Sequence, residues 1–238
     1  MDTTHRRLWL SSFLAAVLSI TNLVHALADD VAGKTAVITA SAGLTSPLGE
    51  GDVAVSGFSG AALAAQSVPA GIDPLTETVI DPSGPSLQIF DLSTLGGPTV
   101  GQVVGAPVKL TLPANAIGQV FALAFDNGTG SGVPNLYAAA TSAYGLQILG
   151  APTANGVRAR LKQGAPGATF MAGQFGSIPG ASPGSIYKID GTTGAVTLFA
   201  DTAFSGVANS GAGIGGAAFD PVSHDLYVSD LDTGLIHR

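Results

Sequence analysis

The stretch AFDPVSHDLYVSDLDTGLIHR, residues 218–238, decides the fold that we expect for this chain. In this stretch, short runs of strand-forming residues alternate with turns that contain Asp, Ser, Pro and Gly. Period-two alternation between such turns is typical of antiparallel β-strands. The stretch therefore predicts strand, turn, strand, turn and strand, after which the sequence stops within a sheet.

Two sequence patterns recur along the chain. A small-residue strand ending in Phe-Asp, a turn, and a strand beginning with Leu-Tyr occur in residues 120–142 and again in 214–230. An alternating strand that ends in Asp, followed by a Gly-containing turn, occurs in residues 84–97 and again in 183–196. With the outgoing strands PVKLTLP and AVTLFAD, these patterns form a cycle of four antiparallel strands. Such a cycle repeated in tandem is typical of β-propeller blades.

We therefore predict an all-β, β-propeller-like fold with about three to four four-stranded antiparallel blades of an incomplete ring. Residues 29–238 form the predicted domain. Blade 1 covers about 45–115, blade 2 covers about 118–202, and an incomplete blade 3 covers about 212–238. The first blade lacks a clear inner strand. Residues 143–183 are interpreted as a long insertion in blade 2 or, alternatively, as a degenerate blade.

The spacing of the repeats departs from that of a regular propeller. Phe125 and Phe219, which open the two Phe-Asp pairs, lie 94 residues apart, whereas a typical blade has ~40–50 residues. An incomplete ring also exposes bare strand edges. We therefore expect the natural polypeptide to continue past Arg238; the alternative is a complete chain that closes by oligomerising.

The C-terminal stretch resembles the blade of the NHL and SMP-30-like six-bladed β-propellers, in which a Leu-Tyr-Val strand ends in Asp and a turn leads to Ile-x-Arg. The matching residues are Leu226, Tyr227, Val228, Asp230, Ile236 and Arg238. The resemblance implies a propeller fold and a link to lactonases that hold a divalent metal with rim carboxylates and an Asn. The other copy of the pattern has Thr141 in place of Asp230. The metal site that the resemblance implies would also require a Glu on the first inner strand and Asn on two later blades.

The N-terminus predicts export. A basic start is followed by the apolar run LWLSSFLAAVLSI, and Ala26 and Ala28 give an A-x-A pattern that places cleavage before Asp29. These are the features of a secretory signal peptide, which we assign to residues 1–28. The alternative is an uncleaved anchor helix, but the apolar run is short for the ~20 residues that span a bilayer. The mature protein is therefore expected to be secreted or periplasmic, with no membrane span.

Composition narrows the range of functions. The 238 residues include 33 Gly and 14 Pro, with 46% hydrophobic and 11% charged residues, which suits short strands joined by turns. The formal net charge is −7, and removal of residues 1–28 takes it to −8. This acidic balance argues against nucleic acid or anionic lipid as a partner. The absence of Cys excludes disulfides, thiol catalysis and Cys-ligated metals.

Three short motifs are better interpreted as loops or surface strands than as catalytic or binding sites. GAGIGG (211–216) has the glycine spacing of a dinucleotide-binding loop, but that motif requires a following helix and we expect a strand. GFSGA (57–61) approaches a nucleophile elbow at Ser59, although its last Gly is shifted by one position. VRARLKQG (157–164) is a solvated strand face or a local site for an acidic partner. Its basic residues are Arg158, Arg160 and Lys162.

Asp126, Asp230 and Asp232 are weak candidates for metal ligands, with Ca²⁺ as the ion considered. They lie in DNGTGSG (126–132) and SDLDTG (229–234), where oxygen ligands stand beside glycines. Calcium sites require several such oxygens in one loop, and neither loop has the full calcium-binding pattern. Asp and Asn in plain turns more often bind their own backbone. The triplet Asn-Gly-Thr that begins at residue 127 is also a formal N-glycosylation sequon.

These observations predict an exported binding or interaction module with an unknown protein or small-molecule ligand at the propeller rim. The repeat scaffold and the lack of an assembled catalytic set of residues support this reading. The alternative is a metal-assisted hydrolase or lactonase of the SMP-30-like type. A third option is a purely structural surface protein.

The intact mass and N-terminal sequence of the native protein from the extracytoplasmic fraction test these expectations. We expect Asp29 as the first residue, because the signal peptide is removed there. We also expect a mass greater than that of residues 29–238. A product that begins at Met1 would contradict cleavage, and a mass equal to that of residues 29–238 would contradict continuation past Arg238.

Overall fold

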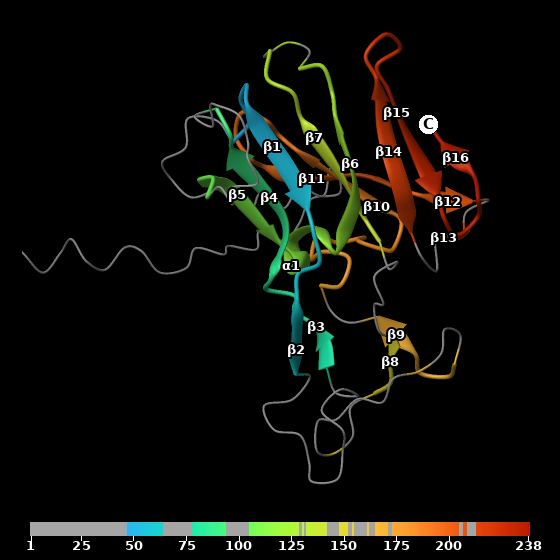
Figure 1. The fold of residues 1–238 in the computed structure, drawn as a ribbon. Coiled ribbons are helices and arrows are strands. Elements are labelled where there is room, and N and C mark those ends of the chain that lie inside the picture. Colours follow the sequence, from blue (N-terminus) through green and yellow to red (C-terminus); the bar gives the residue numbers. More distant parts are fainter. Residues whose placement is uncertain are drawn as a thin grey trace, which may run out of the picture. The chain divides into compact units, whose positions relative to one another are not determined.

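The computed structural model describes the following residues: 47–63, 78–93, 105–128, 130, 132–141, 148–151, 154, 161, 165–170, 173–204, 207–208 and 213–238. The predicted signal peptide lies outside these residues. The described part is all-β, with antiparallel sheets and one short helix, α1 (Ala114–Ile117) (Figure 1). Within it, no helix has the length and apolar character to cross a membrane.

Three larger sheets follow one another along the chain (Figure 1). The first sheet has the order β1-β4-β5, with β1 at Asp52–Ser56, β4 at Pro85–Asp91 and β5 at Val108–Pro113. The central sheet has the order β11-β10-β7-β6, with β6 at Val120–Phe125, β7 at Leu136–Ala140, β10 at Ser185–Ile189 and β11 at Val196–Asp201. The third sheet has the order β14-β15-β16, with β14 at Ile214–Asp220, β15 at Asp225–Asp230 and β16 at Ile236–His237.

Three small hairpins complete the described strands. They are β2 (Ala61–Leu63) with β3 (Thr78–Ile80), β8 (Ile148–Leu149) with β9 (Thr169–Phe170), and β12 (Ala203–Phe204) with β13 (Val207–Ala208). The β2–β3 hairpin lies in the sequence between β1 and β4, and the β8–β9 hairpin lies between β7 and β10. Strands β1, β4 and β5 thus correspond to β7, β10 and β11, with a hairpin inserted at the same point of each sheet.

The strands that alternation and the recurring patterns predict are present as β4, β5, β6, β7, β10, β11, β14, β15 and β16. Strand β1 was not expected. It pairs with β4 in a continuous antiparallel register from Asp52↔Asp91 to Ser56↔Leu87, as β7 pairs with β10. Strand β1 is therefore the equivalent of β7, but it lies at the edge of its own sheet, because no strand of the described residues pairs with its other side.

The central sheet packs against a neighbouring sheet on each face. One face shares a hydrophobic core with the first sheet, and the other face shares a second core with the third sheet. Leu136, Ala138 and Ala140 of β7 belong to the first core, while Tyr137 and Ala139 belong to the second. Side chains alternate between the faces of a strand, so all five residues of β7 are buried. The small alanines let two neighbouring sheets approach this strand.

The turn between β10 and β11 packs tightly against the loop that precedes β7. A Cβ atom built on Gly191 would lie 1.9 Å from the carbonyl oxygen of Pro134. This is backbone, which cannot move aside as a flexible side chain can. The carbonyl of Gly191 also accepts a hydrogen bond from the Leu48 N–H at 3.2 Å, so the turn joins three separate segments.

Substitution of this glycine is expected to loosen the stack of sheets. We predict that Gly191→Ala lowers the free energy of unfolding by about 1–3 kcal/mol, because the added methyl group overpacks the site. Gly105→Ala is the matched control, since nothing lies within 4 Å of its built Cβ. Chemical denaturation of both variants gives the comparison. Equal stability of the two variants would contradict the close contact.

Candidate functional site

Aspartates at the strand ends are held by the turns that follow them. Oδ1 of Asp190, after β10, accepts hydrogen bonds from the N–H groups of Thr192 at 3.0 Å and Thr193 at 2.8 Å, and from Thr193 Oγ1 at 2.9 Å. Gly194 then adopts φ 73° and donates its N–H to the Asp190 carbonyl at 2.8 Å. Glycine suits this left-handed position, so the sequence Asp-x-x-Thr-Gly specifies the turn.

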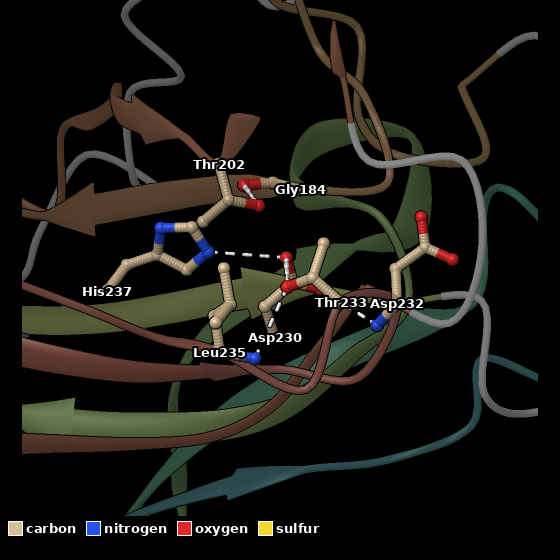
Figure 2. A network of polar contacts seen from close by, with 7 residues as sticks. All are labelled: Gly184, Thr202, Asp230, Asp232, Thr233, Leu235 and His237. Atoms are coloured by element: carbon tan, nitrogen blue, oxygen red, sulfur yellow. Dashed lines mark hydrogen bonds and ion pairs between the residues drawn. The ribbon is translucent and has the colours of Figure 1, made fainter. Parts of the chain in front are cut away.

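The same sequence recurs at Asp230, where it forms a buried network with His237 (Figure 2). Asp230 ends β15 and is 3% exposed. Its Oδ1 accepts from the Asp232 N–H at 2.8 Å, and its Oδ2 accepts from Thr233 Oγ1 at 2.7 Å. His237 of β16 places Nε2 3.2 Å from the same Oδ2. The register Val228↔His237 brings the imidazole to this position.

The hydrogen bonds of the turn keep the Asp230 carboxylate ionised. Burial raises the pKa of Asp230, but the Thr233 hydroxyl, the Asp232 N–H and the His237 ring together lower the pKa below its ordinary value. The balance favours the charged form because each of these groups interacts with the negative carboxylate. Asp230 therefore contributes stability at neutral pH that is lost when the carboxyl group becomes protonated.

The Asp230–His237 pair is a polar contact of the hairpin rather than an assembled catalytic site. The His237 side chain is 24% exposed, so one face of the pair reaches solvent. Figure 2 shows the Asp232 carboxylate pointing away from Asp230, to which Asp232 donates its main-chain N–H. Within the described ranges, no three His, Asp or Glu side chains gather closely enough to hold a metal ion.

Asp126 is held in a comparable way at the end of β6. Its Oδ1 accepts from the Asn135 N–H at 2.7 Å and from the Gly128 N–H at 3.0 Å, and its Oδ2 accepts from Asn135 Nδ2 at 2.7 Å. Burial raises the pKa of Asp126, but the hydrogen bonds from Asn135 and Gly128 have the opposite effect. The pKa of Asp126 therefore lies below its ordinary value. Tyr137 places its hydroxyl 3.4 Å from Oδ2. Burial, followed by the Asp126 charge, raises the Tyr137 pKa.

Asp126 and Asp230 lie at opposite ends of the stacked sheets. Asn127 Nδ2 lies 3.4 Å from the Pro221 carbonyl oxygen, so the β6–β7 turn adjoins the β14–β15 turn. Asp230 is instead in register with Ile214, at the other end of β14. Each of these two carboxylates therefore accepts hydrogen bonds within its own loop.

Ser59 is buried and bonded in a way that does not suit a nucleophile. Its hydroxyl donates to the Asp81 carbonyl at 2.7 Å and accepts from the side-chain amide of Gln119. Neither partner can act as a general base. In the glycine motif 211–216, Ile214 begins strand β14, so the helix that dinucleotide binding requires does not follow. The basic residues Arg158, Arg160 and Lys162 lie outside the described residues.

Sequence reasoning missed Thr233, His237 and Asn135 as partners of the aspartates. The repetition of Asp-x-x-Thr-Gly at 190–194 and 230–234 was a usable signal for Thr233. The contact between His237 and Asp230 depends on the register of a short hairpin, which the sequence does not display. Comparisons with known protein families, curated proteins and solved structures found no match to the chain.

The Asp230 network gives a pH-dependent prediction. Asp230→Asn should lower the free energy of unfolding at pH 7 by about 1–3 kcal/mol, because buried donors lose a charged acceptor. The folded pKa is depressed, so the contribution of Asp230 is complete above the unfolded value of about 4 and fades as the pH falls below it. The stability difference between the wild type and Asp230→Asn should therefore shrink between about pH 5 and pH 2.5.

Asp232→Asn is the matched control, because it removes the same charge from the same turn at an exposed position. We expect it to change stability by less than about 0.5 kcal/mol. Urea denaturation of the three proteins across this pH range gives the comparison. A difference between wild type and Asp230→Asn that stays constant with pH would contradict an ionised, buried Asp230.

Proposed function

We propose that this chain is an exported β-propeller-like binding module that binds a protein or small-molecule ligand at the sheet ends. The stacking of the three sheets is the observation that carries the proposal. Propeller blades pack face to face with their inner strands side by side. The packing of the central sheet between its two neighbours, and the contacts of β6 with β1 and β14, support the proposal.

The turns at one end of the sheets support a role in binding. The turns after β6, β10 and β14 are held by Asp126, Asp190 and Asp220, respectively, and Asn127 bridges to the next sheet through Pro221. Loops fixed on a rigid scaffold are where proteins most often place binding residues. These turns present main-chain groups and polar side chains in defined positions. Such an arrangement suits the binding of a ligand and does not require catalysis.

A metal-assisted hydrolase or lactonase is the alternative, because the C-terminal stretch resembles SMP-30-like blades. It requires a bound divalent cation, whereas a binding module does not. The carboxylates of Asp126 and Asp230 accept hydrogen bonds from their own turns. These bonds occupy part of the acceptor capacity of each carboxylate, so a metal would have to share the oxygens with the turn donors.

Metal content and lactone hydrolysis separate the two functions. For the purified full chain, we expect less than stoichiometric calcium or zinc by elemental analysis, no change in melting temperature on addition of EDTA, and no hydrolysis of a simple lactone. Stoichiometric metal that is lost in Asp230→Ala, together with EDTA-sensitive hydrolysis, would overturn the binding proposal in favour of the enzyme. Asp232→Ala serves as the matched variant in the same turn.

A further inference from the structure

Strand β1 has an edge with which no strand of the described residues pairs. Its equivalent in the central sheet, β7, pairs with β10 on one edge and with β6 on the other. In the third sheet, β15 pairs with β14 in the way that β7 pairs with β6. Strands β6 and β14 each directly precede their partner in the sequence. The repeat therefore predicts a strand beside β1 that comes from the segment before it.

The face of β6 that is turned toward the first sheet is only partly covered by the described residues. Phe125 lies on this face, because it pairs with Leu136 of the first core, and it is 41% exposed. Ala122, in the core shared with the third sheet, is 5% exposed. The equivalent of Phe125 in the third sheet is Phe219, which lies on the face of β14 turned toward the central sheet and is half-buried. The repeated Phe is thus more exposed at the place where the first sheet has no strand that corresponds to β6.

The contacts around this position match those around an occupied one. Strand β1 contacts β6, and Ser56 Oγ donates a hydrogen bond to the Phe121 carbonyl at 3.0 Å. Strand β7 contacts β14 in the same arrangement, while β6 lies beside β7 and packs against β14. A strand that pairs with β1 would likewise pack against β6, where it would cover Phe125.

The chain reaches β1 from the end of the sheets that such a strand requires. Leu48 precedes β1, and its N–H donates to the Gly191 carbonyl at 3.2 Å. Gly191 packs against Pro134, which lies in the loop from β6 to β7. The chain therefore approaches β1 from the end at which β6 leads into β7. A strand that precedes Leu48 in the sequence can run along β1 in the antiparallel direction, as β6 runs along β7.

Residues 34–41, KTAVITAS, have the composition of a strand for this position, and they lie outside the described residues. Val37, Ile38 and the Thr residues are β-branched, which favours strands. The segment also contains alanines, as β6 and β14 do, and it has no Pro or Gly. Two other stretches outside the described residues, 64–77 and 94–104, contain both Pro and Gly, which interrupt strands.

We propose that residues 34–41 pair with the open edge of β1 as an antiparallel strand and cover Phe125 of β6. The first sheet then has the strand order of the central sheet, and the edge of β1 is no longer available to other chains. The segment that follows the predicted cleavage site before Asp29 is thereby anchored to the sheets. This inference rests on the repeat within the chain and is independent of any ligand at the sheet ends.

Engineered disulfides in the full chain test the proposal, because the sequence has no Cys and each double variant can form one disulfide only. Val53 and Val55 lie on the outward face of the first sheet, which is turned away from the central sheet, and are 40% and 47% exposed. Each is changed to Cys together with one residue of 34–41 at a time. A disulfide requires Cβ atoms about 3.5–4.5 Å apart. Each Cys of β1 should therefore cross-link with one preferred position of the segment.

The direction of the strand gives a second readout. In an antiparallel pair, the position preferred by Val53→Cys should lie about two residues later in the sequence than the position preferred by Val55→Cys. Mass spectrometry of peptides from the oxidised protein, without reduction, identifies each cross-link. Val222→Cys is the matched control: Val222 is 87% exposed in the β14–β15 turn, and this variant should cross-link with no position of the segment.

Three results would overturn the proposal. The first is the absence of any cross-link between β1 and residues 34–41, which would assign the edge of β1 to another segment or to a partner. The second is equal cross-linking at all positions, and the third is a preferred position that moves in the same direction as the Cys of β1. Circular dichroism of the reduced variants shows that each one is folded before oxidation.

Discussion

The burial of β7 on both of its faces is the constraint on which the rest of the structure depends. Its residues reach two cores in alternation, and Ala138, Ala139 and Ala140 are all at most 1% exposed. Small side chains there set the separation between the central sheet and its two neighbours, because protein interiors are close-packed. A larger residue at such a position would force the sheets apart. The first and third sheets are therefore positioned by this strand, and the turns at the sheet ends follow from them.

The aspartates show how an acidic chain can use carboxylates for structure. Asp190, Asp220 and Asp230 each accept hydrogen bonds from the turn that follows them. A carboxylate that ends a strand provides acceptors for turn N–H groups that no ladder partner satisfies. The turn hydroxyls of Thr193, Ser223 and Thr233 add a further bond in each case. Asp230, which the sequence suggested as a metal ligand, thus also closes a turn.

The sequence predicts the strands better than it predicts their partners. Alternation and the Phe-Asp and Leu-Tyr pairs locate β4 to β7, β10, β11 and β14 to β16, since they reflect local burial and turn chemistry. Strand β1 was missed because DVAVS is short and its partner β4 follows only after the inserted β2–β3 hairpin. The contact of His237 with Asp230 was missed for a related reason. This contact depends on the register between β15 and β16. That register cannot be derived from the sequence until the ends of both strands are known.

The outward face of the first sheet differs in composition from the equivalent face of the central sheet. Its apolar row of Val53, Phe90 and Val108 is followed by a second row, Val55, Gln88 and Thr111, in which Gln88 Nε2 donates to Thr111 Oγ1 at 3.3 Å. The corresponding row of the central sheet is Ala138, Tyr187 and Leu198. A permanent core would disfavour two polar side chains at such positions, because burying them costs free energy. The outward face of the first sheet therefore combines an apolar row with a partly polar one, whereas the equivalent positions of the central sheet are apolar or aromatic.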